Sequence, residues 1–325
     1  MFRHATGGHS ISSPQPIARA VVTGAAGFVG SHLVRALAEG GTAVVGIDNE
    51  RSGDWGRVDV PCTRVDADIA AVDADGFRDL CRGADVVFHL AAEKYNSSKS
   101  TPQRVIDANI TGTHRLYEGA ARARVPKIVF TSSLYAYGGL GPDAMSEEDI
   151  PTPTTMYGVS KVAGEDMLRV AQRDHGIEWA VARLFFVYGP RQYADGGYKS
   201  VILTNFERIA RGEAPVVFGD GEQALDYVFV DDVVHGLLGM ARPGFTGIVN
   251  LGSGRAVSVN ELTALMMDVA GSDVAPVTGP ADWTAGTRRV GDVALAKRRL
   301  NWSAGTDMRS GLERVWKWMT EAPPA

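Results

Sequence analysis

AVVTGAAGFVG, residues 20–30, joins a short apolar strand to a glycine-rich turn, and the helical run Ser31 to Glu39 follows directly. Gly24 allows a tight turn, Gly27 lets the backbone approach a pyrophosphate, and Gly30 lets the helix pack closely on the strand. The N-terminus of the helix then faces the bound anion. The spacing is GxxGxxG, not GxGxxG, and the order of strand, turn and helix indicates a dinucleotide cradle rather than a plain turn.

The next predicted strand, Ala43 to Ile47, ends at Asp48, about 20 residues beyond the turn. A carboxylate there accepts hydrogen bonds from a ribose diol and repels a 2′-phosphate, which favours NAD over NADP. Arg51 lies nearby and leaves NADP open. The alternative interpretation of Asp48 is a simple loop cap.

Strand-like runs alternate with helical patterns through the first half of the chain, which predicts an α/β fold with a doubly wound parallel sheet of the Rossmann type. After Gly189 and Pro190 the pattern becomes irregular, with a helix near Val201 to Arg211. The chain is expected to return to the sheet near Ile248 to Leu251 before a helix over Val259 to Ala270. We therefore expect a flexible tail (1–17), an NAD-binding domain (18–187 plus about 220–256) and a smaller, discontinuous substrate-binding lobe (about 188–219 plus 257–325). The other predicted strands are Val21 to Thr23, Thr63 to Val65, Val86 to Leu90, Lys127 to Thr131 and Trp179 to Leu184.

Composition agrees with an enzyme that has a large core, since 45% of the 325 residues are hydrophobic and 22% are charged. The net charge of −5 gives no basic field for nucleic acid or an anionic membrane. Cys62 and Cys81 are expected to be reduced thiols, and their spacing suits no metal, so the site is expected to contain none. No signal peptide or membrane span is predicted, and we expect a cytoplasmic protein.

Tyr157 and Lys161 are four residues apart and therefore neighbours on one helical face. The lysine charge is expected to lower the pKa of the phenol toward working pH, so that Tyr157 can act as a base. The pair alone is weak evidence, because Tyr95 and Lys99 repeat the spacing and a solvated helix face explains most such pairs.

Taken together, the motifs resemble the extended short-chain dehydrogenase/reductase superfamily, in its NAD-dependent epimerase/dehydratase branch, typified by UDP-glucose 4-epimerase. The match spans almost the whole chain and follows the family order, through His89-Leu90-Ala91-Ala92, Thr131-Ser132-Ser133 and Tyr188-Gly189-Pro190. It also argues against the second pair, because Tyr95 lies in the loop after the fourth strand. The resemblance implies an NAD site made by Gly24, Ala26, Gly27, Phe28, Val29, Gly30, Asp48, Asn49, Asp68, Ile69, Leu90, Ala91, Ala92, Asn109, Thr131, Tyr157, Lys161, Phe185 and Val187.

The resemblance also implies roles for three catalytic residues. Tyr157 would take the substrate hydroxyl proton while the adjacent carbon gives hydride to the nicotinamide. Lys161 would hold the nicotinamide ribose, and Ser133 would hydrogen-bond the same substrate oxygen. The structural alternatives are a strand-end cap for Ser133 and a surface charge for Lys161.

Departures from the family pattern concern the substrate's diphosphate. Phe186 stands where most relatives have an asparagine, and Leu225 stands where they have a phosphate-binding arginine. A further arginine is usual near Asp282 and Trp283, whereas Arg288 and Arg289 lie at a shifted register. Each charge-assisted hydrogen bond contributes roughly 1.5–3 kcal/mol, so a standard UDP-sugar pose is doubtful unless other cations compensate. The candidates for compensation are Arg191, Lys199, Arg183, Arg288 and Lys94.

Two alternatives stay open: a substrate without a nucleotide, such as a free or amino sugar or a cyclitol against an apolar wall, or a small misalignment that hides a normal site. Leu134 and Tyr135 replace the Asp-Glu pair of 4,6-dehydratase relatives, which argues against dehydration. We expect an NAD-dependent sugar epimerase, most simply at C4, with an NAD(H)-dependent dehydrogenase or ketoreductase and a noncatalytic NAD-binding protein as alternatives. The resemblance further implies a homodimer formed through helices near Pro102 to Ala123 and Tyr157 to His175. The expected sugar pocket consists of Glu93, Lys94, Tyr95, Ser133, Leu134, Tyr135, Phe186, Arg191, Leu225 and Arg288.

Overall fold

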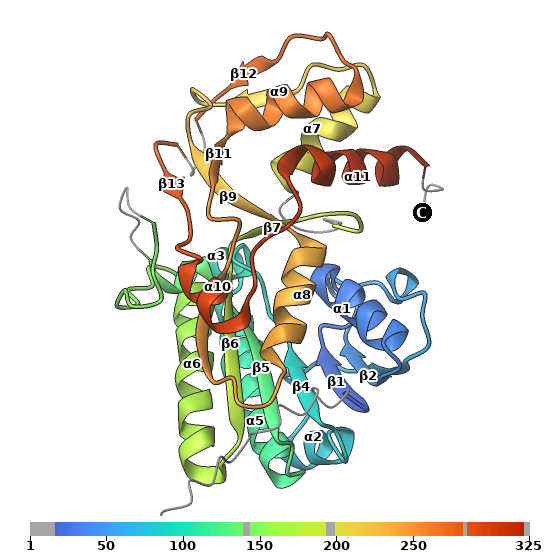
Figure 1. The fold of residues 1–325 in the computed structure, drawn as a ribbon, viewed down its shortest axis with the longest axis vertical. Coiled ribbons are helices and arrows are strands. Elements are labelled where there is room, and N and C mark those ends of the chain that lie inside the picture. The colour runs from blue at the N-terminus through green and yellow to red at the C-terminus, as the bar shows by residue number, and fades with distance from the viewer. Residues whose placement is uncertain (1–16, 139–143, 193–198, 282–284, 322–325) are drawn as a thin grey trace, which may run out of the picture.

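The structure is a computed structural model that describes residues 17–138, 144–192, 199–281 and 285–321 (Figure 1). The predicted flexible tail falls outside these residues except for Ile17, which packs partly against the core. The Ile17 carbonyl oxygen accepts a hydrogen bond from the Thr42 hydroxyl at 2.8 Å. Ile17, the last residue of the expected tail, is therefore part of the described fold.

The larger part of the molecule is built on a seven-stranded sheet in the order β10-β6-β5-β4-β1-β2-β3. Every strand pairing in this sheet is parallel, which confirms the predicted doubly wound fold. Each strand run predicted from the sequence lies in it, including the late return of the chain as β10. The strands are β1 (Arg19–Thr23), β2 (Ala43–Asp48), β3 (Thr63–Asp66), β4 (Val86–His89), β5 (Lys127–Ser133), β6 (Glu178–Leu184) and β10 (Gly247–Leu251).

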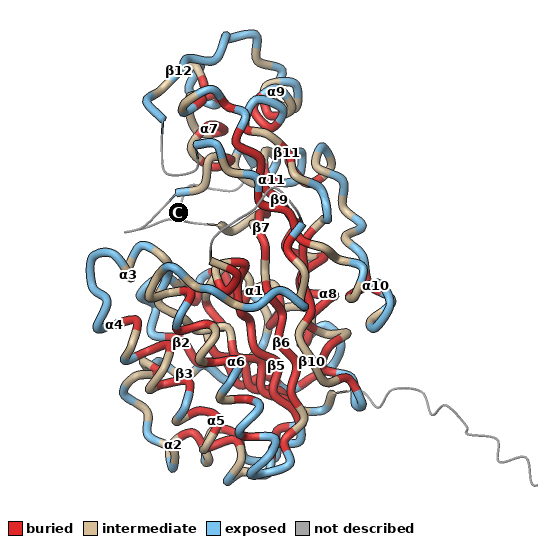
Figure 2. The backbone as a smooth tube through the Cα atoms, turned by 90° about the vertical axis from the view of Figure 1, so that its left-hand side faces the viewer, coloured by how far each residue is buried: buried red, intermediate tan, exposed pale blue. Residues whose placement is uncertain are grey.

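Helices cover both faces of this sheet because successive strand residues point to opposite sides. On β1, Ala20 and Val22 join one apolar cluster, whereas Val21 joins the other. Figure 2 shows buried backbone along the strands between these layers. One face packs on α1 (Phe28–Glu39), α8 (Val230–Met240) and α10 (Ala294–Leu300), and the other on α2 (Ala74–Leu80), α5 (Thr113–Arg122) and α6 (Met156–His175). Short segments precede α5 and α6: α3 (Ser97–Ser100), α4 (Pro102–Ile106), a π-helical turn (Asp107–Gly112) and η3 (Leu134–Ala136).

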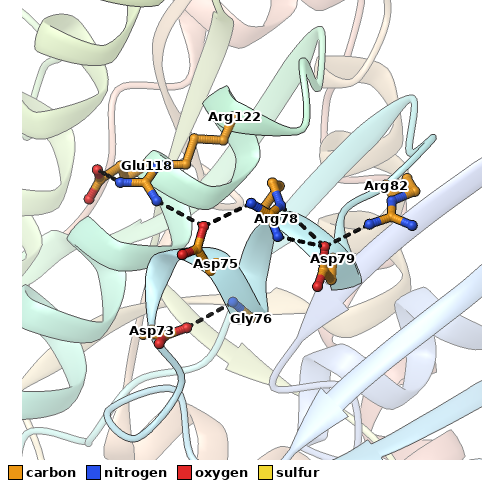
Figure 3. Close-up of polar contacts among 8 residues, drawn as sticks. All are labelled: Asp73, Asp75, Gly76, Arg78, Asp79, Arg82, Glu118 and Arg122. Atoms are coloured by element: carbon orange, nitrogen blue, oxygen red, sulfur yellow. Dashed lines mark hydrogen bonds and ion pairs between the residues drawn. The ribbon is translucent and has the colours of Figure 1, made fainter.

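Helices α2 and α5 pack closely at Gly119, where an added Cβ would lie 2.4 Å from the Phe77 Cβ. Arg122 on α5 donates to Asp75 on α2 at 3.0 Å, and Asp75 also accepts from Arg78 (Figure 3). These charged groups are exposed, so the apolar contact beneath them contributes more to stability than the ion pairs do. The remaining residues in Figure 3 are Asp73, Gly76, Asp79, Arg82 and Glu118.

The smaller lobe is organised around β9, which pairs with β11, β13 and β7. A separate two-stranded ribbon of β8 and β12 lies beside it. Helix α9 has a capping box between Ser258 and Glu261 and ends at Gly271, whose φ is 64°. The elements are β7 (Phe186–Tyr188), α7 (Val201–Ala210), β8 (Val216–Phe218), β9 (Ala224–Phe229), β11 (Ala256–Ser258), α9 (Val259–Ala270), β12 (Val277–Gly279), β13 (Arg288–Arg289) and α11 (Met308–Glu321).

The boundary between the two parts differs from the expected residue ranges. The chain leaves the large sheet after β6, and both β7 and β9 lie in the smaller sheet, although residues 186–187 and 220–256 were assigned to the NAD-binding domain. The reason is that β7 and β9 pair with each other, a contact between distant segments that strand patterns do not reveal. We retain the two-part division as a proposal, with β7 and β9 moved to the smaller lobe. Cys62 and Cys81 are both free thiols, as expected.

Candidate active site

A cleft opens at the carboxyl ends of the large-sheet strands, where the glycine turn meets the N-terminus of α1. Gly24 has a φ of 71°, a conformation that favours glycine. A Cβ on Gly30 would lie 1.9 Å from the Gly24 carbonyl oxygen, so the helix packs directly on the turn. Gly27 lines the cleft between them. The turn therefore has the geometry of a cradle for a dinucleotide diphosphate.

Asp48 lies at one end of this cleft and is 8% exposed. Its carboxylate accepts hydrogen bonds from the Ala26 amide at 3.0 Å and the Glu50 amide at 2.8 Å. Burial raises the pKa of Asp48, and these backbone hydrogen bonds oppose the rise. A carboxylate has about four acceptor positions, so oxygen lone pairs remain for a ribose diol. Arg51, which kept NADP open, forms an ion pair with Glu93 at 3.1 Å.

Most residues predicted to contact NAD line this cleft together. Ala26 is the first exception, since it is fully buried and serves Asp48 through its amide. Asn109 is the second: its side chain donates to the Glu93 carbonyl at 3.0 Å and to the Ser160 hydroxyl at 3.1 Å. Asn109 thus holds the loop after β4 against α6. The predicted residues that line the cleft are Gly24, Gly27, Phe28, Val29, Gly30, Asp48, Asn49, Asp68, Ile69, Leu90, Ala91, Ala92, Thr131, Tyr157, Lys161, Phe185 and Val187.

Several other residues line the cleft that no sequence motif indicated. Ser52, Gly53 and Arg57 come from the loop between β2 and β3. A Cβ on Gly53 would lie 2.6 Å from the Asp48 carboxylate, which explains a glycine there. The signal that could have revealed Gly53 is its place five residues after Asp48, in a turn-forming Ser-Gly-Asp stretch.

Ser133, Tyr157 and Lys161 meet at the other end of the cleft. Ser133 ends β5, and Tyr157 lies in the first turn of α6, which Thr155 caps by accepting from the Gly158 amide at 3.0 Å. The Lys161 ammonium is 5.5 Å from the centre of the Tyr157 ring and donates to the Thr131 carbonyl at 2.9 Å. The predicted trio is therefore brought together by one strand end and one helix.

The expected lowering of the Tyr157 pKa is wrong for the polypeptide itself. Burial raises the pKa of Tyr157 to about 12, and a hydrogen bond with Ser133 opposes that rise only in part. Burial also lowers the pKa of Lys161 to about 7, against the attraction of Glu165. Burial removes solvation from the charged form of each group, and Lys161 is not among the groups that shift the pKa of Tyr157.

Tyr135, one of the residues predicted for the sugar pocket, packs against Tyr157 and brings Tyr95 close to it. The ring of Tyr135 meets that of Tyr157 edge to face at 5.8 Å and stacks on Tyr95 at 4.7 Å. Glu93 lines the cleft, but its carboxylate is held by Arg51, Arg104 and Ser97. Lys94 also lines the cleft, on its cofactor side.

Other predicted sugar-pocket residues lie away from the catalytic trio. Leu134 is 2% exposed and belongs to an apolar cluster with Tyr137, Met145 and Phe185. Phe186 alternates with the cleft-lining residues Phe185 and Val187, so its side chain points toward the smaller lobe, 6.1 Å from the Tyr227 ring.

Four of the five cations nominated to compensate for the missing diphosphate contacts are engaged elsewhere or exposed, and the fifth, Lys94, lines the cleft. Arg191 donates to the Arg57 carbonyl at 3.1 Å, on the cofactor side. Arg183 is buried in an ion pair with Glu165, Lys199 pairs with Glu207, and Arg288 is exposed. Asp282 and Trp283, the family's expected arginine region, lie outside the described residues.

Arg289 lies at the shifted register noted in the sequence but was not nominated as a substrate cation. Strand β13 pairs with β9 so that Arg289 is the register partner of Leu225, and Arg289 is 7% exposed. Its guanidinium lies 5.6 Å from the Tyr135 ring centre and donates to the Tyr135 hydroxyl at 3.5 Å. Because neighbouring residues of a strand point to opposite faces, Arg288 faces solvent while Arg289 faces the site. Arg289 therefore replaces Arg288 as the candidate substrate cation.

The dinucleotide cradle, the ribose carboxylate and the Ser-Tyr-Lys trio on one parallel sheet define a nicotinamide-dependent enzyme of the short-chain dehydrogenase/reductase class. Residues 20–252 match the family model described as the NAD dependent epimerase/dehydratase family. The chain belongs to this family, and it is an NAD-dependent epimerase with NAD as its cofactor. No helix in the described part of the chain has the length and apolar character needed to cross a membrane.

Relatives of known name support the assignment over nearly the whole chain. The chain is 34% identical to a putative UDP-glucose 4-epimerase of Methanocaldococcus jannaschii, over 92% of this chain and 97% of the relative. It resembles the crystal structure of a Thermotoga maritima UDP-glucose 4-epimerase with UDP-glucose, with a TM-score of 0.87 and 33% identity, covering 93% of this chain and 99% of the other. A Thermus thermophilus UDP-glucose 4-epimerase complex with NAD matches with a TM-score of 0.84 and 28% identity, covering 94% and 100%.

Proposed function

We propose that this enzyme inverts C4 of a UDP-hexose by transient oxidation to the 4-keto sugar and re-reduction. The observation that carries the proposal is the position of Arg289 at the register of Leu225, close to the Ser133-Tyr157-Lys161 trio through Tyr135. One buried cation thus lies beside the position where Leu225 replaces the family's arginine. The names of the Methanocaldococcus and Thermotoga relatives support the same substrate class.

The trio supplies the proton chemistry of such a reaction. Tyr157 takes the proton of the C4 hydroxyl, and Ser133 hydrogen-bonds the same oxygen as its bond to carbon becomes double. NAD, when bound, supplies the hydride acceptor and a positive ring that favours the Tyr157 phenolate. Burial raises the pKa of Tyr157 to about 12, so the phenolate is disfavoured until a positive charge lies nearby. The keto sugar then turns and accepts hydride on its other face, with Tyr157 returning the proton.

Dehydration is not part of this proposal. Elimination of water needs an acid and a base on the sugar's more distant carbons. The two residues after Ser133 are instead Leu134, which is buried in an apolar cluster, and Tyr135, whose hydroxyl faces Arg289. Neither position provides a carboxylate.

A second candidate function is an NAD(H)-dependent dehydrogenase or ketoreductase acting on a sugar, amino sugar or cyclitol without a nucleotide. The observation that favours it is the apolar cluster on β7 and β9, where the buried side chains of Leu225 and Tyr227 pack with Phe186. Phe186 and Leu225 offer no group that could bind a phosphate oxygen. This candidate predicts stoichiometric production or consumption of NADH, whereas the epimerase produces no net change in NADH.

The experiment is a substrate panel followed by proton NMR. The purified enzyme is incubated with UDP-glucose, UDP-N-acetylglucosamine, UDP-glucuronate, dTDP-glucose, GDP-mannose, free glucosamine and myo-inositol, while absorbance at the NADH wavelength is recorded. We expect a UDP-sugar to equilibrate with its C4 epimer at constant NADH. Turnover of a non-nucleotide substrate with accumulation of NADH would favour the second candidate and contradict the first.

We also propose that the enzyme is a homodimer formed through α6 and the neighbouring α5. Val159 and Val170 on α6 are 40% and 46% exposed. They are eleven residues apart, about three helical turns, and therefore share one face of the helix. A pair of exposed valines on one face is consistent with a helix that packs on a second copy.

A further inference from the structure

We propose that Tyr135 is a positioning residue that couples binding of the substrate's diphosphate at Arg289 to the orientation of the catalytic phenol of Tyr157. The inference rests on the proposed function, because it takes Arg289 as the cation for the diphosphate. It goes further by assigning a role to a residue between the two ends of the site. The role is a mechanical connection rather than a direct contact with the reacting atoms.

The ring of Tyr135 is fixed from two sides. Tyr135 lies in the η3 turn, two residues after Ser133. Its amide donates a hydrogen bond to the Ser133 hydroxyl at 3.3 Å. Tyr95 stacks on the ring with an interplanar angle of 22°, and Tyr157 meets it at 79°. Offset-stacked and edge-to-face arrangements are both favourable geometries for aromatic pairs. The position of Tyr135 therefore restricts the ring of the catalytic base.

The same ring is contacted from the smaller lobe. Arg289 belongs to β13, which reaches the site through its pairing with β9, far from η3 in sequence. The guanidinium lies 5.6 Å from the centre of the Tyr135 ring, within the range of a cation-π contact. Its hydrogen bond to the Tyr135 hydroxyl, at 3.5 Å, is at the long limit for such a bond. The guanidinium thus contacts Tyr135 both over its ring and at its hydroxyl.

These contacts form a continuous path from Arg289 through Tyr135 to Tyr157. When a diphosphate engages Arg289, the guanidinium changes its partner and its position over the Tyr135 ring. Because the rings of Tyr135 and Tyr157 are in edge contact, a shift of the first moves the phenol of the second. A displacement of about 1 Å at a catalytic group can change a rate by on the order of 100-fold, so a small movement is enough to matter.

Tyr137, at the C-terminal end of the same turn, makes only structural contacts among the described residues. Its hydroxyl donates to the Asn250 side chain at 2.6 Å, and its ring lies 4.5 Å from the Arg183 guanidinium. It is 4% exposed and belongs to the apolar cluster with Leu134 and Phe185. Tyr137 therefore provides a control for loss of a tyrosine hydroxyl at this turn without a contact to Tyr157.

The test is a double-mutant cycle between Arg289→Ala and Tyr135→Ala, with Tyr135→Phe as the conservative variant and Tyr137→Phe as the control. The measured quantities are kcat and KM with UDP-glucose, the Kd of UDP by calorimetry, and the Tm of each NAD-loaded protein. Alone, Tyr135→Ala is expected to lower kcat at least about 10-fold while the Kd of UDP changes less than about threefold. Tyr135→Phe, which keeps the ring contacts, is expected to restore kcat to within about threefold of wild type.

The decisive quantity is the non-additivity of the cycle. Arg289→Ala is expected to raise the Kd of UDP and to lower kcat about fivefold with Tyr135 present, but to leave kcat nearly unchanged in the Tyr135→Ala background. Tyr137→Phe is expected to lower only Tm. Additive effects on kcat, or a Tyr135→Phe variant as slow as Tyr135→Ala, would overturn the coupling while leaving the proposed function intact. A wild-type enzyme that binds neither UDP nor UDP-glucose would instead overturn the proposed function, and the coupling with it.

Discussion

Arg51 and Glu93 form an ion pair, with 3.1 Å between Nε and Oε1, that joins two loops lining the cofactor cleft. Arg51 follows β2 and Glu93 follows β4, and β1 lies between these two strands in the sheet. The pair therefore spans the cleft above the end of β1, where the glycine turn begins. A dinucleotide bound on that turn would have to pass this ion pair to reach solvent.

We predict that Arg51→Ala accelerates release of NAD. The ion pair is partly exposed and is worth about 1 kcal/mol, which corresponds to about a fivefold faster dissociation. The measurement is the rate at which excess labelled NAD replaces the NAD bound to the loaded enzyme. High salt is expected to reduce the difference between the variant and wild type.

Arg104→Ala provides the matched control for this prediction. Arg104 pairs with the same Glu93 oxygen at 3.4 Å, but it comes from α4 and is not among the described residues that line the cleft. Its loss is expected to change NAD release less than about twofold. If both variants release NAD equally fast, any cation beside Glu93 has the same effect. The Arg51–Glu93 ion pair would then not be what retains NAD.

The buried ion pair of Glu165 and Arg183 leads to a stability prediction. Both side chains are 1% exposed, and the Arg183 Nη2 lies 2.7 Å from the Glu165 Oε2. Glu165→Gln leaves the Arg183 charge buried without its counter-ion, so the free energy of unfolding should fall by about 3–5 kcal/mol. The neighbouring exposed pair of Asp166 and Arg169 supplies the control, Asp166→Asn, which should have little effect. If urea unfolding shows the same loss of unfolding free energy for both variants, burial of the Glu165–Arg183 pair does not determine its effect on stability.

The lowered pKa of His89 should make the protein less stable in mild acid. His89 is fully buried between the hydroxyls of Thr23 and Thr113, and burial, assisted by the charge of Lys161, lowers its pKa from 6.5 to about 3. Between these two values the unfolded chain binds a proton that the folded chain does not, so stability falls as the pH decreases from 6.5 toward 3.

The His89 contribution at pH 5 amounts to about 2 kcal/mol relative to neutral pH. Urea unfolding at pH 7 and pH 5, compared between wild type and His89→Gln, measures it. The variant should lose less stability over this interval than wild type by about that amount. An identical pH dependence of the two proteins would show that His89 is protonated without penalty.

A charge introduced into the proposed dimer interface should separate the two subunits. Val170→Glu places a charge on the exposed α6 face, where burial against a second copy would strip it of water. Sedimentation velocity should then show a monomer. Ile150→Glu is the control, since Ile150 is 82% exposed and lies outside α6. A monomeric wild type, or a Val170→Glu variant that still dimerises, would exclude this face.

The parts of the fold that follow from local pattern could be predicted from the sequence. The glycine turn at residues 24–30 determined the cofactor end, and apolar runs such as Val86 to His89 gave the large sheet. The Ser133-Tyr157-Lys161 trio was also predictable, because one strand end and one helical turn place its members.

Features that depend on long-range pairing could not be predicted. Arg289 reaches the site because β13 pairs with β9, about sixty residues earlier, and only that register distinguishes Arg289 from the exposed Arg288. Leu134 likewise resembled a pocket residue by its place after Ser133, but the η3 turn directs it into the core. The direction of the Tyr157 pKa shift was missed because burial depends on the whole site rather than on helical spacing.

The central claim is that the Tyr157 phenol removes the proton from the substrate hydroxyl. The most direct measurement is the turnover of UDP-glucose by Tyr157→Phe, together with the NAD content of the purified variant. The account predicts that kcat falls at least about 1,000-fold while NAD remains bound, because only the proton-accepting oxygen is lost. A variant that retains NAD and turns over UDP-glucose at the wild-type rate would contradict it.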